Sequence, residues 1–315
     1  MQRFNHLAFV FPGQGSQSFG MLASLSEAFP EVRRVFSRAS EVLHFDLWEL
    51  VTAGPENLLN RTENTQPVML AAGVAVWEIW CGQTPVRPGW MAGHSLGEFT
   101  ALVCANSISF EVAITLVRQR ARLMQEAVPA GQGAMAAVIG LDDPVIVEIC
   151  RKISRPGCTV AAGNFNAPAQ VVIAGNRAAV DAAIEAARAA GARQAVLLSV
   201  SVPCHCELMQ AAAEKFSETL RGINFAAPEF PVIHNFDVVS HTDSEVIRSV
   251  LVKQMYSPVR WVESIKYLYG QGVTKIVECG PGKVLSGLNK RIVRDCETYP
   301  VIDPDTLDKA MENCE

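Results

Sequence analysis

A serine flanked by two glycines is the feature of this chain best suited to chemistry. The segment GHSLG, residues 93–97, places Ser95 two residues from Gly93 and two residues from Gly97. In the pattern G-x-S-x-G the glycines let a strand and a helix approach closely, and the serine stands on a strained turn with its hydroxyl exposed. We therefore treat Ser95 as a candidate nucleophile, with a simple helix-capping serine as the alternative.

The segments on both sides of Ser95 favour the nucleophile. PGWMAG, residues 88–93, can form a short strand, and EFTALVCA, residues 98–105, has the composition of a helix. Ser95 would then lie at the amino terminus of a helix, where the helix dipole stabilises a developing negative charge. The sequence thus predicts a strand, a turn that bears Ser95, and a helix.

A serine hydroxyl needs a base, and His205 is the best placed of the six histidines. His94 adjoins Ser95, and neighbours on a tight turn point their side chains apart. His205 follows a predicted strand that ends in SVSVP and lies in a loop that opens a helical segment, and loops at the carboxyl ends of strands carry the chemistry of α/β proteins. The alternative is a structural histidine. A metal site at Cys204-His205-Cys206 is disfavoured, because ligands one residue apart rarely close on one ion and no second ligand pair is visible.

An acid for a serine, histidine and acid triad is not evident. The α/β-hydrolases carry serine, acid and histidine in that order along the chain. Here the acids between Ser95 and His205 lie mostly in the early helix or in the inserted subdomain described below. Two interpretations stay open: either a backbone or amide carbonyl orients His205, or the triad interpretation fails.

An arginine on an apolar helix face is the second candidate functional group. Residues 110–128 predict a helix. The neighbours of Arg120 at three- and four-residue spacing are Leu116, Val117, Leu123 and Met124. Arg122 has polar neighbours instead, as an ordinary solvated arginine does. A buried guanidinium needs an anion, which is either a protein carboxylate such as Glu98 or Glu111, or a substrate carboxylate held by two hydrogen bonds.

These residues must be positioned by an α/β fold. LAFVFPG, residues 7–13, is a short apolar strand, and later apolar strands alternate with helix-length segments, as in a parallel sheet with crossover helices. Between residues 133 and 200 the order becomes the ferredoxin-like βαββαβ unit. We predict a hydrolase-like α/β core with a parallel sheet, residues 1–130 and 198–315, and an inserted ferredoxin-like subdomain, residues 131–197. The segment after Val293 is predicted to be a short polar tail.

Composition limits the class of protein. The chain has 315 residues, of which 49% are hydrophobic, and a formal net charge of −5 from 27 basic and 32 acidic residues. Neither sign forms a long run, so nucleic-acid binding is disfavoured. The longest mainly apolar stretch, residues 68–80, is too short to span a bilayer, and the amino terminus lacks the zones of a signal peptide. Nine cysteines without CxxC pairs suit reduced thiols in the cytoplasm.

Several segments, spread from about Phe9 to Val293, carry a resemblance to a known family. They are FPGQGSQ (11–17), GHSLGE (93–98), QRARLMQEAVP (119–129), NFNAPAQVVIAG (164–175), SVPCHCELM (201–209), QMYSPVRW (254–261) and GPGKVL (280–285). In this order and spacing they resemble the malonyl-CoA:acyl carrier protein transacylases of bacterial type II fatty acid synthesis. The fold of that family agrees with the fold predicted above.

The resemblance implies a role for each candidate residue. Ser95 would be the nucleophile that becomes malonylated, and His205 its general base and acid. The backbone carbonyl of Gln254 would orient His205 with support from Asn235, which explains the missing acid. The oxyanion would be held by the backbone N–H groups of Gln14 and Leu96. Arg120 would hold the malonyl carboxylate, and the other implied substrate-binding residues are His94, Met124 and Asn166.

The resemblance also implies the activity and the partners. The activity is ping-pong transfer of a malonyl group from malonyl-CoA to the phosphopantetheine thiol of acyl carrier protein. No metal and no bound cofactor are expected, and the glycine patterns lack the spacing of nucleotide-binding loops. We expect a monomer without nucleic-acid or membrane partners. Because carrier proteins are acidic as a family, Lys283, Lys290 and Arg291 are expected to form a basic docking patch.

Three residues depart from the pattern of the family, and two other classes of protein stay open. Cys204 and Cys279 stand where serine and an aliphatic residue are common, and both changes are expected to leave the roles intact. Phe236 stands where valine is common and could narrow a wall of the site. A serine esterase or thioesterase would share the serine and the histidine but has no use for Arg120. A non-catalytic carrier-binding protein would not need Ser95.

Overall fold

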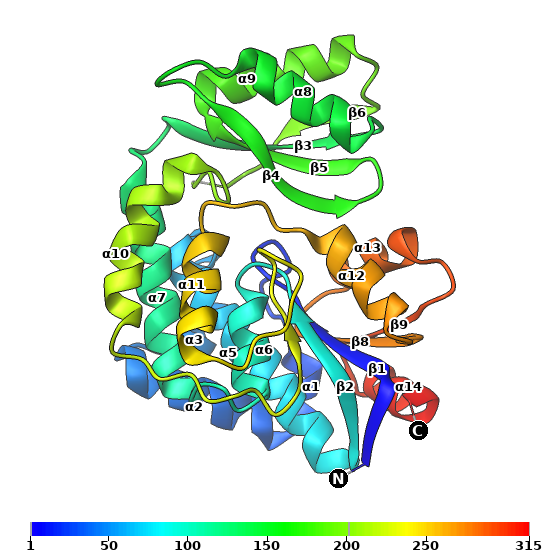
Figure 1. Ribbon diagram of the computed structural model, residues 1–315. Coiled ribbons are helices and arrows are strands. Elements are labelled where there is room, and N and C mark those ends of the chain that lie inside the picture. The colour runs from blue at the N-terminus through cyan, green and yellow to red at the C-terminus, as the bar shows by residue number, and fades with distance from the viewer. Residues whose placement is uncertain (1, 201, 315) are drawn as a thin grey trace.

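The computed structural model describes residues 2–200 and 202–314, which form a large α/β part and a smaller part beside it (Figure 1). The large part contains a sheet of parallel strands in the order β7-β2-β1-β8-β9. The bounds of these strands are β1 (Gln2–Phe11), β2 (Val86–Gly93), β7 (Val232–Ile233), β8 (Lys275–Cys279) and β9 (Glu297–Val301). Phe11 pairs with Gly93, so β1 and β2 end together. The segments that follow these two strands therefore meet at one edge of the sheet.

The central strand β1 is buried on both faces. Phe9 and Phe11 belong to the larger core cluster, whereas Ala8 and Val10 pack into a second cluster on the opposite face. All four side chains are fully buried. A strand covered on both faces needs a continuous apolar run, which is why LAFVF forms the centre of the sheet.

Helices cover both faces of this sheet. The second cluster is formed with α12 (Trp261–Gly270) and α13 (Val284–Ile292), and the larger cluster with most of the other helices. These are α1 (Ala23–Ala28), α2 (Pro30–Leu43), α3 (Leu47–Thr52), α4 (Glu56–Leu59), α5 (Thr62–Gln83), α6 (Gly97–Cys104), α7 (Phe110–Ala127), the 3₁₀ turn η1 (Glu207–Met209), α10 (Gln210–Leu220), α11 (Ser244–Gln254) and α14 (Pro304–Cys314). None of the helices in the described residues combines the length and apolarity that crossing a bilayer requires.

The smaller part is a four-stranded antiparallel sheet in the order β4-β5-β3-β6. Its elements in chain order are β3 (Gly133–Ile139), α8 (Asp143–Ile153), β4 (Val160–Ala167), β5 (Gln170–Asn176), α9 (Arg177–Ala189) and β6 (Gln194–Leu197). Helices α8 and α9 pack on one face. The other face, which includes Met135 and Val172, packs against Cys206 and thus faces the loop that carries His205. The predicted α/β fold with a parallel sheet and a ferredoxin-like unit is confirmed.

The structure confirms one local prediction and contradicts another. The helix that carries Arg120 is confirmed as α7, which ends at Ala127. The prediction of a polar tail after Val293 is wrong, because β9 adds a strand to the parallel sheet and α14 packs against the larger core cluster. The polar residues of the tail obscured an amphipathic pattern: Leu307, Ala310 and Cys314 share one buried stripe of α14.

Candidate active site

Ser95 stands on a tight turn between β2 and α6, as the sequence predicted. Its backbone has φ of 52°, a left-handed conformation that a residue with a side chain rarely adopts. A Cβ atom added at Gly93 would lie 1.9 Å from the backbone of Gly97, and one added at Gly97 would lie 2.0 Å from the carbonyl oxygen of Phe11. Only glycine fits at both positions, so strand and helix can close around the serine.

His205 contacts the Ser95 hydroxyl directly. The Ser95 Oγ lies 2.7 Å from His205 Nε2, and His205 Nδ1 lies 2.8 Å from the backbone carbonyl oxygen of Gln254. A carbonyl oxygen only accepts hydrogen bonds, so Nδ1 carries the proton and Nε2 of the neutral ring accepts the hydroxyl proton of Ser95. The structure therefore has the carbonyl arrangement, which was the first of the two interpretations left open by the missing acid.

Burial keeps the His205 ring neutral. The side chain is buried, and burial, reinforced by the nearby charge of Arg120, lowers the pKa of His205 to about 3. The backbone N–H of His205 donates to the carbonyl oxygen of Met255, which fixes the loop. This loop does not follow a strand directly, because β6 ends at Leu197. Ser201, which begins the SVPCHCELM segment, lies outside the described residues.

Asn235 has partners other than the expected ones. Its Oδ1 accepts from the backbone N–H of Ser95 at 2.7 Å, and its Nδ2 donates to the carbonyl oxygen of Gly93 at 2.7 Å. The expected support of His205 or of the Gln254 carbonyl is thus replaced by two bonds to the turn that bears Ser95. The physical reason is that the N–H of Ser95 and the carbonyl oxygen of Gly93 need hydrogen-bond partners, and the amide of Asn235 supplies both.

Arg120 is buried and points at the serine. Its Nη2 donates to Gln254 Oε1 at 2.8 Å and to Ser95 Oγ at 3.3 Å, and its Nη1 donates to Gln66 Oε1 at 2.9 Å. Its Nε has no hydrogen-bond partner within the described part of the chain. Burial lowers the pKa of Arg120 to about 10. In water every N–H group of an arginine is hydrogen-bonded to solvent. Here Nε–H has no partner among the described residues, so the guanidinium can still donate to a bound anion.

The protein carboxylates considered for Arg120 are bound elsewhere. Glu111 forms an ion pair with Arg38. Glu98 is buried and accepts from Gln254 Nε2 instead, one side chain away from the guanidinium. Arg122 is exposed, as predicted, with Glu63 Oε2 at 4.0 Å from its Nε. The guanidinium of Arg120 therefore has only neutral hydrogen-bond partners among residues 2–200 and 202–314.

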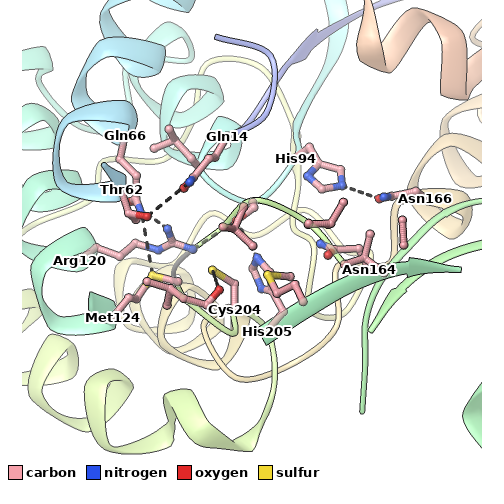
Figure 2. A pocket seen from close by; sticks show the side chains of 18 of the residues that line it. Gln14, Thr62, Gln66, His94, Arg120, Met124, Asn164, Asn166, Cys204 and His205 are labelled. Atoms are coloured by element: carbon pink, nitrogen blue, oxygen red, sulfur yellow. Dashed lines mark hydrogen bonds between the residues drawn. The ribbon is translucent and has the colours of Figure 1, made fainter. Parts of the chain in front are cut away.

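These groups face a cavity of about 280 Å³ between the two parts of the chain (Figure 2). The sequence-predicted residues that line it are Gln14, His94, Ser95, Leu96, Arg120, Met124, Asn166 and His205. Phe236 is not among the lining residues, so it does not narrow a wall. Cys204 lines the cavity beside Arg120. Gln254 and Asn235 lie behind the wall and reach the site through their hydrogen bonds.

Two features of the cavity suit acyl chemistry. The backbone N–H groups of Gln14 and Leu96 are engaged by no hydrogen bond in the described residues, and both residues border the cavity next to Ser95. Free N–H groups there can stabilise an oxyanion. His94 Nε2, which also borders the cavity, lies 2.8 Å from Asn166 Oδ1, and this contact joins the large part to β4. Burial lowers the pKa of His94, so this ring is neutral as well.

Sequence reasoning missed Gln66 and the side chain of Gln254. Gln66 lies in α5, where it is 2% exposed among apolar neighbours. A polar residue inside an otherwise apolar helix was the available signal. The side-chain role of Gln254 had no signal, because its partners are distant in sequence.

No metal site is found in the parts of the chain that the structure describes, where no group of three or more His, Cys, Asp and Glu residues could hold an ion. The side chains of His205 and Cys206 in the Cys204-His205-Cys206 segment make hydrogen bonds to protein groups. His205 contacts Ser95, and Cys206 Sγ donates to the carbonyl oxygen of Pro203.

Known proteins are similar to this chain in sequence. The model of the acyl transferase domain matches residues 8–310. The malonyl CoA-acyl carrier protein transacylase of Salmonella typhimurium is 50% identical over 96% of this chain and 98% of that protein. The protein of the same name from Bacillus subtilis is 43% identical over 97% and 96%.

Solved structures agree over nearly the whole chain. The malonyl-CoA:acyl carrier protein transacylase of Xanthomonas oryzae pv. oryzae has a TM-score of 0.97 and 50% identity, covering 99% of each chain. A malonyl-transacylase in complex with a type II PKS acyl-carrier protein has a TM-score of 0.96 and 52% identity, covering 98% of this chain and 99% of that one. This chain therefore belongs to the acyl transferase domain family and, within it, to the malonyl CoA-acyl carrier protein transacylases.

Proposed function

We propose that this chain transfers a malonyl group from malonyl-CoA to the phosphopantetheine thiol of acyl carrier protein, through a malonyl ester of Ser95, in fatty acid biosynthesis. One observation carries the proposal beyond general acyl transfer. The Nη2 atom of the buried Arg120 lies 3.3 Å from Ser95 Oγ, and within the described part of the chain the guanidinium has no charged hydrogen-bond partner and donates to uncharged groups. A carboxylate at the far end of the acyl group supplies the anion that a buried guanidinium needs.

The first half of the reaction forms the acyl-enzyme. His205 Nε2 takes the proton of Ser95 as Oγ attacks the thioester carbonyl carbon. The negative charge that develops on the carbonyl oxygen is stabilised by the backbone N–H groups of Gln14 and Leu96. The carbon–sulfur bond then breaks, and the CoA sulfur leaves with the proton from His205. The Gln254 carbonyl, 2.8 Å from His205 Nδ1, keeps the ring in the required tautomer.

The second half reverses these roles. The phosphopantetheine thiol of the carrier gives its proton to His205 Nε2, and its sulfur attacks the ester carbonyl of malonyl-Ser95. The ester bond to Oγ breaks, and Ser95 regains its proton from His205. Each half thus ends with a neutral histidine and no net gain or loss of protons. No metal and no bound cofactor takes part in this scheme.

Steady-state kinetics test this function. Initial rates measured against both malonyl-CoA and holo carrier should give parallel double-reciprocal lines, with malonyl-carrier formed in equal amount to CoA. A serine thioesterase would instead release CoA and free malonate whether or not the carrier is present. Intersecting lines would show that both substrates must bind before reaction, which the acyl-enzyme scheme forbids.

The proposal extends to the cellular compartment, the oligomeric state and the domain boundaries of the enzyme. We infer a cytoplasmic enzyme, because all nine cysteines are free thiols, as is usual in a reducing compartment. That the enzyme is a monomer stays a prediction. We also infer a division of the chain at residues 131 and 197. It is supported by the antiparallel sheet, whose strands all lie between Gly133 and Leu197.

The carrier is proposed to dock on the exposed face of α13. Gly282 packs against the loop after β1, because a Cβ added there would lie 3.4 Å from the carbonyl oxygen of Ser16. The next residue, Lys283, therefore lies near this loop. Lys290 lies seven residues on, two helical turns away and on the same face. Arg291 donates to the carbonyl oxygen of Pro168 and to Gln170 Oε1 at the β4–β5 turn, so both of its terminal nitrogens already have a hydrogen-bond partner. We therefore expect Lys283 and Lys290 to contribute most.

Charge reversal tests this patch. The double change Lys283→Glu and Lys290→Glu should raise the KM for holo carrier roughly tenfold and leave the KM for malonyl-CoA unchanged, because the carrier is acidic. Lys152→Glu is the matched control, since Lys152 is exposed on α8, on the far face of the small sheet. Equal KM values for the carrier in the double variant and the control would exclude this docking face.

The acylation rate should hardly depend on pH in the acid range. A histidine with the ordinary pKa of about 6.5 is mostly protonated at a pH of about 5 and is then no base. Burial and Arg120 lower the pKa of His205 to about 3, so its neutral form persists. Single-turnover acylation by malonyl-CoA should therefore lose less than about twofold between pH 7 and pH 5. A tenfold fall over this range would show that His205 titrates as an exposed histidine does.

A further inference from the structure

The carboxylate of Glu98 has no part in the chemistry described so far. It lies in the first turn of α6, is fully buried, and is not among the residues that line the cavity. Three donors reach it: His234 Nδ1 at 2.7 Å, the backbone N–H of Asn235 at 2.9 Å and Gln254 Nε2 at 2.9 Å. A buried carboxylate is costly unless it is satisfied in this way. A fully buried carboxylate three residues after Ser95 calls for a function.

Glu98 fixes the direction of the Gln254 amide. Gln254 Nε2 donates to Glu98 Oε2 and to the backbone carbonyl oxygen of Ser95, both at 2.9 Å. The carbonyl oxygen only accepts, and an ionised carboxylate only accepts too, so the amide nitrogen must face them. The amide oxygen then faces the other way and accepts from Arg120 Nη2 at 2.8 Å. A flipped amide would set its N–H groups against the guanidinium and its oxygen against the carboxylate.

Arg120 is thus oriented by groups without charge. Gln254 Oε1 and Gln66 Oε1 accept from its two terminal nitrogens. A carboxylate in direct contact would form an ion pair that competes with a substrate carboxylate for the same N–H groups. Glu98 acts from one side chain farther away, where its charge polarises the amide and stabilises the guanidinium without occupying it.

We propose that Glu98 and the side chain of Gln254 are positioning residues that make Arg120 selective for an acyl group bearing a carboxylate. The inference rests on the proposed function, because it concerns the same malonyl transfer. Gln254 then serves two purposes, since its backbone carbonyl orients the base and its side chain orients the arginine. Glu98 and Gln254 are not among the residues that line the cavity, so both would act through Arg120.

The test is a competition between malonyl-CoA and acetyl-CoA for Ser95. Gln254→Met keeps the backbone carbonyl and the volume but removes the amide, and Glu98→Gln removes the charge that fixes it. Glu111→Gln is the matched control, because Glu111 is paired with Arg38 on the surface. The measured quantity is the ratio of malonyl to acetyl adducts on the intact protein at short times, with the unfolding temperature of each variant.

The ratio should fall in both variants by roughly tenfold to a hundredfold, which corresponds to one hydrogen bond to a charged group. The rate of malonyl acylation should fall more than the rate of acetyl acylation in both variants, because His205 keeps its carbonyl partner and only the malonyl group needs the guanidinium. If Glu98→Gln does not fold, the ratio of malonyl to acetyl adducts on Gln254→Met tests the positioning role by itself. The Glu111→Gln control should keep the wild-type ratio.

Two other outcomes are distinguishable. A wild-type protein that takes up no malonyl group would overturn the proposed function itself. A wild-type protein that is malonylated, together with a Gln254→Met variant that either keeps the wild-type ratio or loses both acyl groups equally, would overturn only the positioning role. In the second case the amide would be a structural group with no bearing on selectivity.

Discussion

A Ser95→Ala variant is expected to take up no malonyl group from malonyl-CoA and to lose malonyl transfer by at least about 10⁴-fold. The reason is that the Ser95 hydroxyl, 2.7 Å from His205 Nε2, supplies the only bond through which the acyl group is held between the two half-reactions. The measurement is the intact mass of the variant after exposure to malonyl-CoA, together with the rate of malonyl-carrier formation.

Ser109→Ala provides the matched control. Ser109 caps α7 by accepting from the backbone N–H of Val112, away from the cavity. Loss of the cap should lower the free energy of unfolding by about 1 kcal/mol and leave transfer unchanged. A stable adduct on Ser95→Ala would place the acyl group on another nucleophile and exclude the proposed scheme.

An Arg120→Ala variant is expected to lose malonyl acylation by about a hundredfold or more, while acetyl acylation changes little. The malonyl carboxylate would lose its charged partner in a buried cavity, whereas the acetyl group has no charge to leave unpaired. The loss should appear in kcat/KM for malonyl-CoA. Loss of the nearby positive charge should also raise the pKa of His205, because Arg120 contributes to lowering it.

Arg122→Ala is the control for this change, because Arg122 lies two residues further along the same helix and its side chain is 55% exposed. It should leave both acyl groups unaffected. Arg120→Lys is informative as well, since an ammonium cannot reproduce the two-pronged contact of a guanidinium with a carboxylate. Equal losses for malonyl and acetyl groups in Arg120→Ala would show that Arg120 supports the fold rather than selectivity.

The parts of the site that depend on local pattern were predictable from the sequence. The turn at Ser95 follows from two glycines at fixed spacing, and the burial of Arg120 follows from apolar neighbours at helical spacing. The α/β fold followed in the same way, because strands and helices each have a period that can be read along the chain.

The parts that depend on contacts distant in sequence were not predictable. Asn235 reaches Ser95 across 140 residues, and the Gln254 amide reaches Glu98 across 156 residues. An amide has no period and no partner type that its neighbours reveal. The same limit explains why Glu98 was considered a direct partner of Arg120, although an amide stands between them. In α14 the reason differs, because polar residues masked a short apolar stripe.

The most direct test of the central claim is the intact mass of the wild-type protein, measured after malonyl-CoA and again after addition of holo carrier. We predict the gain of one malonyl group, followed by its loss from the protein and its appearance on the carrier. Free CoA accumulating without any gain in protein mass, or a malonyl adduct that passes to water at the same rate with and without carrier, would contradict transfer through Ser95.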